Sequence, residues 1–277
     1  MNGLVVIEAD AVELAAVYAK ESNVEIRELH SSAEMQTAAQ LLADVWGLEP
    51  MRMQVKPDML IALAHAGNYV VGAFDGEEMV AACIAFFYAP KDLALHSHIA
   101  GVARDRAGSG IGKALKYHQR AWCLGRGVET MTWTFDPLVA RNAFFNLERL
   151  GASPAQYLPN FYGEMTDELN RGQASDRLLL NWDLRNPGFT PSNSEGTVPP
   201  AVLSRGERGP VLDLALAEQV RACRVEIPTD VEFLRRSDPA AAERWRLALR
   251  GTLIPLLAGG WHIVGFDRSG FYRIERN

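Results

Sequence analysis

The feature that most constrains the fold is a strand, a glycine-rich turn and an amphipathic helix in direct succession, residues 95–127. The turn holds Gly108, Gly110 and Gly112, and the helix predicted to follow covers residues 111–124. A glycine turn that leads into a helix leaves several backbone N–H groups without intrahelical partners, and the helix dipole favours negative charge there. The sequence therefore predicts an anion-binding turn in a protein of mixed strands and helices.

Two other phosphate-binding motifs are excluded by the residues themselves. A P-loop would need glycine at Ala107 and serine or threonine at Ala114. A dinucleotide-binding fingerprint would need a third glycine at Lys113. The turn therefore belongs to another class of anion site.

Basic residues gather around this turn although the chain is acidic overall. The 277 residues include 28 Lys and Arg against 34 Asp and Glu, a formal net charge of −6. With no long basic block, this balance argues against a nucleic-acid-binding protein. Around the turn, by contrast, a single acid, Asp105, stands among Arg104, Arg106, Lys113, Lys116 and Arg120. We expect a local field that suits a ligand with several phosphates.

At these residues the chain resembles the GNAT (Gcn5-related) acyltransferase family, whose pyrophosphate loop reads Arg/Gln-x-x-Gly-x-Gly/Ala after a strand ending in Val. Residues 107–112 fill that pattern, and Val102 ends the strand. Ala107 stands where the family has Arg or Gln, so the resemblance implies that Arg106 supplies the missing contact. It implies acetyl-CoA or succinyl-CoA as acyl donor. The coenzyme-binding residues that it implies are Gly101, Val102, Ala103, Arg106, Ala107, Gly108, Ser109, Gly110, Ile111, Gly112, Lys113 and Asn142.

The resemblance covers residues 24–185, where the order of predicted strands and helices matches the family. It implies an α/β (α+β) fold, a mixed twisted sheet flanked by helices. The runs WTFDPLVARNAFFNLERLG, NFYGEMTDELN and SDRLLLNW further resemble a subfamily associated with amino-acid N-acylation, including succinyl transfer. Ala140 replaces the usual Asn, and Leu147 replaces the Tyr that often protonates the leaving thiolate. The resemblance therefore implies a different general acid, or none.

Four segments follow from the pattern along the chain. Residues 1–23 are an N-terminal extension with a helix around Val12 to Lys20, and residues 24–185 form the acyltransferase domain. The proline-rich segment 186–200 is predicted to be a linker. Residues 201–277 are predicted to be a small α+β unit, and a degenerate half-repeat of residues 137–163 is an open alternative.

His96 and His98 are the candidate bases. They lie two apart on the strand predicted over residues 93–102 and therefore share a face. His96 falls six residues before Val102, where the resemblance places a catalytic Glu. The reference pKa of histidine, ~6.5, suits removal of a proton from an amine. The alternative is a pair of core histidines satisfied by hydrogen bonds, and a zinc site lacks an evident third ligand, so we expect no metal.

Further candidates follow the glycine turn. Tyr162 is a candidate for the missing acid. The candidate substrate-binding residues are Trp133, Asp136, Arg141 and Arg177, because a carboxylate at a strand end holds an ammonium and a succinyl group needs a cation. The structural alternatives are core packing for Trp133 and capping of a helix over residues 137–150 for Asp136.

These features together predict an N-acyltransferase that moves an acyl group from CoA to a small-molecule amine, most plausibly an amino acid, by direct attack with general-base help. A CoA-ester-binding regulatory protein without turnover and a protein N-acetyltransferase stay open, because fold does not determine the acceptor. A homodimer is also open.

Cys83, Cys123 and Cys223 lie far apart and show no metal-ligand spacing, so we expect buried, reduced thiols and a cytoplasmic protein. The N-terminus lacks the basic region of a signal peptide, and no apolar run approaches the ~18 residues of a membrane span. We therefore expect neither secretion nor a membrane partner.

Overall fold

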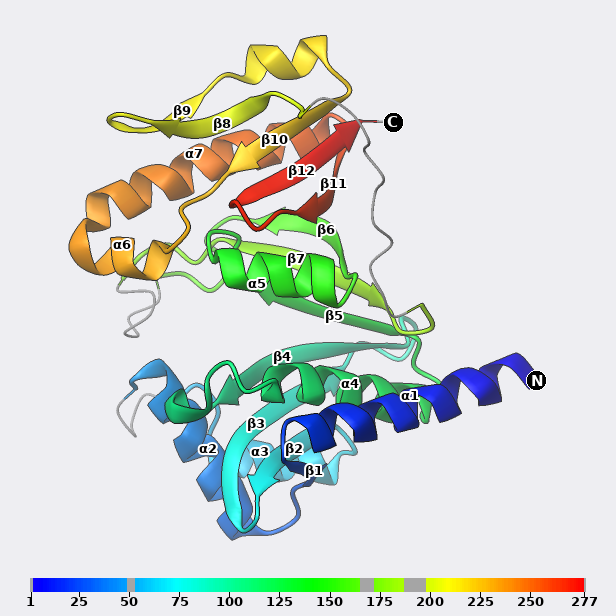
Figure 1. Ribbon diagram of the computed structural model, residues 1–277. Helices are drawn as coiled ribbons and strands as arrows, with labels where there is room; N and C mark the ends of the chain where they lie inside the picture. Colours follow the sequence, from blue (N-terminus) through cyan, green and yellow to red (C-terminus); the bar gives the residue numbers. More distant parts are fainter. Residues whose placement is uncertain (1, 49–52, 165–171, 187–197, 277) are drawn as a thin grey trace. The chain divides into compact units, whose positions relative to one another are not determined.

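The computed structural model describes residues 2–48, 53–164, 172–186 and 198–276 (Figure 1). The chain divides into two compact units, Met1–Trp133 with Asp183–Arg185, and Thr134–Trp182 with Asn186–Asn277. Each unit combines strands with helices, which confirms the predicted mixed α/β class. Most of the predicted linker lies outside the described residues, and the predicted domain boundaries stay a prediction.

The first unit contains a mixed sheet with strand order β1-β2-β3-β4-β5. Neighbouring strands are antiparallel from β1 to β4, and β4 and β5 are parallel. Strands β2 and β3 form a hairpin that turns at Gly76, where Asp75 pairs with Glu78. The elements are α1 (Asn2–Glu21), β1 (Glu25–Glu28), α2 (Ser32–Trp46), α3 (Pro57–His65), β2 (Tyr69–Asp75), β3 (Glu78–Phe87), β4 (Ala94–Val102), η2 (Arg104–Arg106), α4 (Ile111–Leu124) and β5 (Thr130–Phe135).

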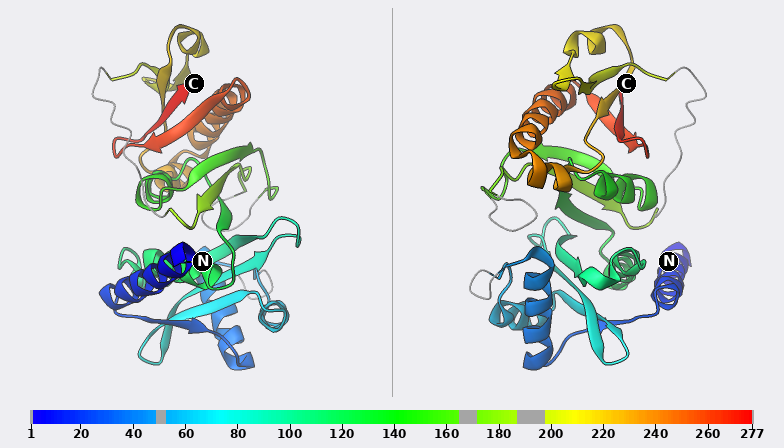
Figure 2. Two further views of the ribbon diagram at one scale, coloured as in Figure 1. Left: turned by 90° about the vertical axis from the view of Figure 1, so that its right-hand side faces the viewer. Right: turned by 60° about the vertical axis from the view of Figure 1, so that its left-hand side comes forward.

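Helices cover both faces of this sheet, as Figure 2 shows. Alternate residues of a strand point to opposite faces, and here Val70 and Ile84 join a core cluster with α2 and α3. On the other face, the hydroxyl of Tyr69 lies 2.9 Å from Nδ1 of His118 on α4. Helix α1 packs mainly along α4 and also contacts strand β1. Strands β2 and β3 are therefore buried on two sides, which explains their nearly continuous apolar sequence.

Short-range signals set the ends of the main helices. Helix α2 begins with a capping box in which the Ser31 hydroxyl accepts from the Glu34 amide and the Glu34 carboxylate accepts from the Ser31 amide. It ends at Gly47 in the left-handed region, φ +63°. Helix α4 spans the predicted residues 111–124 and follows Gly110, also left-handed.

The second unit contains a five-stranded sheet in the order β11-β12-β10-β8-β9 and an antiparallel pair, β6 with β7. Helix α7 begins at Pro239 after the N-cap Asp238, whose side chain accepts from the amide of Ala241. The elements are α5 (Ala140–Phe144), η3 (Phe145–Arg149), β6 (Ser153–Leu158), β7 (Arg177–Asp183), β8 (Ala201–Gly206), β9 (Gly209–Leu212), η4 (Leu214–Gln219), β10 (Ala222–Glu226), α6 (Val231–Ser237), α7 (Pro239–Ala258), β11 (Trp261–Phe266) and β12 (Phe271–Arg276).

The helix predicted over residues 137–150 is wrong in its start and in its winding. Asp136 does not cap it, because the N-cap is Val139 and the carboxylate of Asp136 accepts from the amide of Leu138. After five α-helical residues the chain continues as the π-helix η3. A turn at residues 137–138 precedes the helix, and the Asp136 side chain also binds other partners, which are described below.

Two segments, residues 140–183 and 239–276, share the same order of elements. A helical segment followed by two antiparallel strands occurs in residues 140–183 and again in residues 239–276. This order is compatible with the predicted half-repeat, which stays a prediction.

Candidate functional site

The glycine turn before α4 has the geometry of an open cradle. Gly108 and Gly110 have φ of +82° and +89°, in the region that favours glycine over residues with a Cβ. A Cβ added at Gly108 or Gly112 would meet no atom within 4 Å. The backbone of the turn is therefore accessible to a ligand.

Four backbone amides of this turn are free to donate hydrogen bonds to a ligand. Within the described part of the chain, the N–H groups of Gly108, Gly110, Ile111 and Gly112 donate no hydrogen bond. Those of Ile111 and Gly112 also lie in the first turn of α4, where the helix dipole favours an anion. The turn can accordingly hold a phosphate or pyrophosphate through main-chain donors alone.

The N-terminal helix α1, which the sequence left without a role, borders the cradle. Ser22 Oγ lies 2.9 Å from the position that a Cβ would take on Gly110. Tyr18 packs against Tyr117 of α4 with ring centroids 4.5 Å apart, and Nζ of Lys113 lies 3.5 Å from the centroid of the Tyr18 ring. No sequence signal pointed to Ser22, because its proximity arises from helix packing.

The predicted basic field around the turn is only partly correct. Nη2 of Arg106 lies 2.8 Å from a carboxylate oxygen of Asp75, in the hairpin between β2 and β3. Lys116 and Arg120 are buried, and Nε of Arg120 donates to the carbonyl of Leu184 at 2.7 Å. Two of the five basic residues therefore point into the first unit and do not form a solvated face beside the turn.

Among the residues that the structure describes, the half of strand β4 that leads to the cradle has no neighbouring strand on its β5 side, and we call this side the open edge of β4. Strand β4 pairs with β3 from Leu95 to Val102, but with β5 only from Ala94 to His96. The β3 register shifts so that Ile84 pairs with Ile99 and Ala85 with Ser97, which leaves His98 without a partner on β3. This is a β-bulge, a feature that occurs often beside active sites. In the described pairings, residues 97–102 present unpaired backbone groups on the β5 side.

The two predicted bases lie together, as expected from their spacing. The rings of His96 and His98 are 6.2 Å apart, and both pack against Phe86. Nδ1 of His96 lies 3.1 Å from the hydroxyl of Thr132, which in turn lies 2.9 Å from the hydroxyl of Tyr88. These contacts orient the His96 ring and leave its Nε2 for a substrate. His98 is more exposed.

Both histidines are neutral at neutral pH. Burial, together with the nearby His98 and Lys116 charges, lowers the pKa of His96 to about 4. Burial also lowers the pKa of His98. A neutral imidazole can accept a proton, so both stay candidates for the base.

Lys116 on α4 is the unexpected neighbour of this strand. Its Nζ donates to Oγ of Ser97 at 2.8 Å and lies 4.0 Å from the centroid of the Trp133 ring. The residue is 8% exposed, and no described carboxylate lies within ion-pair distance. Burial lowers the pKa of Lys116 to about 8.

Gln119, one turn further along the same face of α4, is also buried, at 0% exposure. Neither its amide nitrogen nor its amide oxygen has a hydrogen-bond partner among the described atoms. Buried polar groups in folded proteins are nearly always satisfied. The face of α4 turned to β4 therefore holds more hydrogen-bonding capacity than the protein fills.

Asp136, predicted as a substrate-binding residue, is enclosed by arginines of the second unit. Nη2 of Arg246 lies 2.9 Å from Oδ2, Arg235 donates to the same oxygen, and Nη1 of Arg177 lies at 3.8 Å. Burial alone would raise the pKa of Asp136, but the arginine charges outweigh it and hold the pKa well below the ordinary range. Sequence reasoning missed Arg235 and Arg246, about a hundred positions further on.

The other predicted residues of the second unit lie on different elements. The Arg141 guanidinium forms an ion pair with Glu232 at the surface. The Tyr162 hydroxyl lies 3.3 Å from that of Thr134, and the Arg177 guanidinium lies 5.5 Å from the centroid of the Tyr162 ring. Asn142 is half-buried on α5. Tyr162 and Arg177 are thus neighbours, whereas Arg141 is occupied by Glu232.

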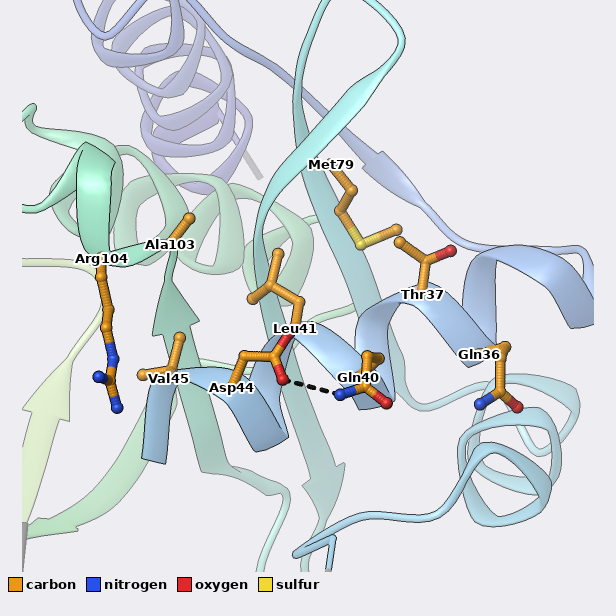
Figure 3. Close-up of a pocket in the computed structure, with 9 residues that line it drawn as sticks. All are labelled: Gln36, Thr37, Gln40, Leu41, Asp44, Val45, Met79, Ala103 and Arg104. Carbon is orange, nitrogen blue, oxygen red and sulfur yellow. Dashed lines mark hydrogen bonds between the residues drawn. The ribbon is translucent and has the colours of Figure 1, made fainter. Parts of the chain in front are cut away.

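A hollow of about 600 Å³ lies between α2 and the segment after β4 in the first unit (Figure 3). Of the predicted coenzyme-binding residues, Ala103 lines it. Gln40 donates to Asp44 at 2.7 Å across its wall. The remaining lining residues are Gln36, Thr37, Leu41, Val45, Met79 and Arg104.

Two classes of site are absent from the part of the chain that the structure describes. It contains no cluster of three or more His, Cys, Asp or Glu side chains that could hold a metal ion. Its helices include none that is long and apolar enough to cross a membrane. All three cysteines are free and buried, as predicted.

No family model and no curated protein sequence matches the chain. Solved structures similar to it include a candidate GNAT acetyltransferase from Desulfovibrio desulfuricans, at 16% identity over 58% of this chain and 99% of that one, with a TM-score of 0.46. The ribosomal-protein-S18-alanine N-acetyltransferase of Escherichia coli matches at 14% identity, 62% and 99% coverage, and a TM-score of 0.46. A candidate acetyltransferase from Salmonella typhimurium, solved with its cofactor acetyl-CoA, matches at 14% identity over 62% of this chain and 99% of that one, with a TM-score of 0.47.

Proposed function

We propose that this protein is an acyl-CoA-dependent N-acyltransferase that acts on a small-molecule amine, with an amino acid as the first candidate acceptor. The observation that carries the proposal is the cradle of four available amides at Gly108, Gly110, Ile111 and Gly112. Main-chain donors at a helix N-terminus suit the pyrophosphate of CoA. Lys113 in the first turn of α4 can add positive charge, whereas Arg106 already pairs with Asp75.

The open edge of β4 suits the rest of the coenzyme. A pantetheine arm carries two amide groups in an extended chain, and such a chain can hydrogen-bond to an exposed strand edge. From Val102 to Ser97 the strand spans roughly 17 Å at ~3.3 Å per residue. An arm that leaves the cradle and follows this edge brings the thioester to the middle of β4, next to His96 and His98.

The chemistry then needs a base and little else from the protein. The acceptor nitrogen attacks the thioester carbonyl, the carbon–sulfur bond breaks, and the nitrogen loses a proton. His96 or His98 accepts that proton, because both imidazoles are neutral at physiological pH. The unpaired amides at the β4 bulge are donors for the oxygen of the tetrahedral intermediate.

Acetyl and succinyl groups both fit this scheme. A succinyl carboxylate would need a cation, and both predicted arginines already lie beside carboxylates, Arg141 beside Glu232 and Arg177 beside Asp136. The E. coli neighbour acetylates a ribosomal protein by its name, so a protein acceptor is the second candidate. A regulatory protein without turnover is the third, because Leu147 stands where the resemblance expects Tyr.

The test is release of free CoA from acetyl-CoA and succinyl-CoA with a panel of amino acids, simple amines and peptides. Turnover with a small amine supports the proposal, and turnover with peptides alone favours the second candidate. Binding of acyl-CoA without turnover on any acceptor favours the third. Titration calorimetry with CoA tests the cradle itself.

Gly108→Glu should abolish CoA binding, because it places bulk and negative charge on the amides. The matched control is Gly127→Glu, at a glycine with a similar positive φ and open surroundings at the other end of α4. If both variants bind CoA like the wild type, the cradle is not the site.

Loss of the base should be equally clear. Replacement of the true base, His96 or His98, by Ala should lower kcat/KM by ~10² to 10⁴ at neutral pH. CoA affinity should hardly change, and the loss should shrink as the acceptor amine deprotonates at higher pH. Full activity of both single variants would show that the histidines are structural.

A further inference from the structure

The ammonium of Lys116 has no task in the mechanism above, although it lies against the same strand. We propose that Lys116 is the general acid of the transfer step and gives its proton to the thiolate that leaves the acyl donor. This inference rests on the proposed function. It names a catalytic residue that neither the resemblance nor the glycine turn assigns.

The position of Lys116 is the first argument. Its Nζ contacts Ser97 of β4 and Trp133 of β5, the residues that directly follow the last paired positions, His96 and Thr132. The ammonium therefore lies where the two strands stop pairing, at the inner end of the open β4 edge. A thioester at this end of the edge has its sulfur within reach of the lysine.

The second argument is the arrangement of acid and base. His96 and Ser97 are adjacent in β4, so their side chains leave opposite faces of the sheet. The histidines lie against Phe86 on one face, and Lys116 approaches Ser97 from α4 on the other. A thioester at the β4 edge can therefore have the base on one face and the acid on the other. The attacking amine loses its proton to a histidine, and the leaving thiolate gains one from Lys116.

The third argument is electrostatic. The groups around Lys116 on either face of the sheet are His96 and Ser97 of β4, Cys83 of β3, Trp133 of β5 and Cys123 of α4, and none of them is an ionised acid at neutral pH. The buried ammonium, with a pKa of about 8, thus matches a thiol of reference pKa ~8.5. Proton transfer removes both charges at once, which burial favours.

The step balances without another reactant. The amine nitrogen forms a bond to the carbonyl carbon, and the electron pair of the carbon–sulfur bond goes to sulfur. The Nζ proton moves to sulfur, so CoA leaves as a thiol and Lys116 is neutral. Water carries the proton that the histidine took from the amine back to Lys116, so the cycle neither gains nor loses a proton.

Gln119 is independent evidence that a ligand reaches the space between α4 and β4. Its amide is fully buried and lacks any partner in the described structure. A lysine that merely filled the core would not explain a buried, unsatisfied amide one turn further along the same helix. A polar group of the acyl-CoA arm is the partner that we assign to it.

The kinetic test compares the wild type, Lys116→Met, Lys116→Arg and the exposed control Lys20→Met over pH 6 to 10 with acetyl-CoA and the best amine of the panel. We expect Lys116→Met to lose ~10²-fold in kcat at pH 7. The loss should shrink above pH 8, where the wild type also lacks the proton. Lys116→Arg keeps the charge but cannot give up a proton, so it should be equally slow. A wild-type rate in Lys116→Met, or full rescue in Lys116→Arg, overturns the proposal.

A second measurement needs no acceptor. The ultraviolet absorbance of the thiolate follows ionisation of bound CoA, with desulfo-CoA as the blank. An ammonium beside sulfur should lower the thiol pKa of bound CoA in the wild type and in Lys116→Arg, but not in Lys116→Met. Equal titration in the wild type and Lys116→Met overturns the inference even if the enzyme turns over. A wild type that binds CoA without turnover overturns the proposed function instead.

Discussion

The two compact units treat buried charge in opposite ways. In the second unit, Asp136 contacts three arginines, and Asp176 binds Arg250 together with the hydroxyl of Tyr157. In the first unit, the described environment of Lys116 offers one hydroxyl and one aromatic ring. One unit surrounds its buried charges with opposite charges, and the other leaves a cation without one.

The pKa values show what this difference means. Arginine charges and hydrogen bonds outweigh the effect of burial and hold the pKa values of Asp136 and Asp176 below their ordinary range. At Lys116, burial dominates and lowers the pKa to about 8. The second unit keeps its charges at every physiological pH, which suits a structural role. The first unit holds a proton that can leave, which suits chemistry.

The largest expected effect comes from removal of the central carboxylate in the second unit. Asp136→Asn keeps an acceptor for the amide of Leu138 but leaves Arg235 and Arg246 without their counterion. The free energy of unfolding should fall by about 3–5 kcal/mol, as for other broken buried ion pairs. Urea denaturation of the full chain at pH 7 measures it.

The pH dependence sharpens this prediction. The folded-state pKa of Asp136 is lowered, so its contribution is present above the unfolded pKa of ~3.9 and is lost only as the pH falls below it. The difference between wild type and Asp136→Asn should therefore be constant from pH 7 to about 5. A difference below about 1 kcal/mol at pH 7 would mean that the arginines are satisfied without Asp136.

The second-largest expected effect concerns Lys116 of the first unit, where a substitution should increase the free energy of unfolding. Lys116→Met removes a buried ammonium and should raise the free energy of unfolding at pH 7 by about 1–3 kcal/mol. The folded-state pKa of about 8 lies below the ordinary value of 10.5, so the unfolded chain binds more protons between these values. Wild-type stability therefore rises with pH across this window, and the advantage of the variant shrinks there.

Denaturant curves at pH 7 and pH 10 check the Lys116 prediction, and Lys20→Met is the control for loss of an exposed lysine. A variant that is more stable and less active would show that the first unit keeps a costly charge for function. If Lys116→Met is less stable at both pH values, the ammonium belongs to the structural charges after all.

The smallest effect is expected for the ion pair between Arg141 and Glu232. The side chain of Arg141 is 66% exposed, and exposed pairs contribute about 0–1 kcal/mol. Arg141→Ala should thus change the free energy of unfolding by less than about 1 kcal/mol and lose most of that effect in high salt. A loss comparable with that of Asp136→Asn would extend the buried network of the second unit to its surface.

Local sequence signals determined most of the first unit. The Asp75–Gly76 hairpin, the Ser31 cap, the extent of α4 and the common face of His96 and His98 all depend on residues within a few positions of one another. Turn chemistry, capping and the two-residue period of a strand act at that range. These features can therefore be predicted from the amino-acid sequence alone.

Only the tertiary structure decided which way the charged side chains point. The sequence placed Lys116 in a basic field around the turn and made Asp136 a substrate-binding residue or a helix cap. In the structure Lys116 contacts Ser97 and Trp133, and Asp136 contacts Arg235, 99 positions away. Ser22 reaches Gly110 because α1 packs along α4. Such contacts join elements distant in the sequence, and no short-range preference encodes them. Burial, which sets the pKa values at both sites, exists only once those elements have packed.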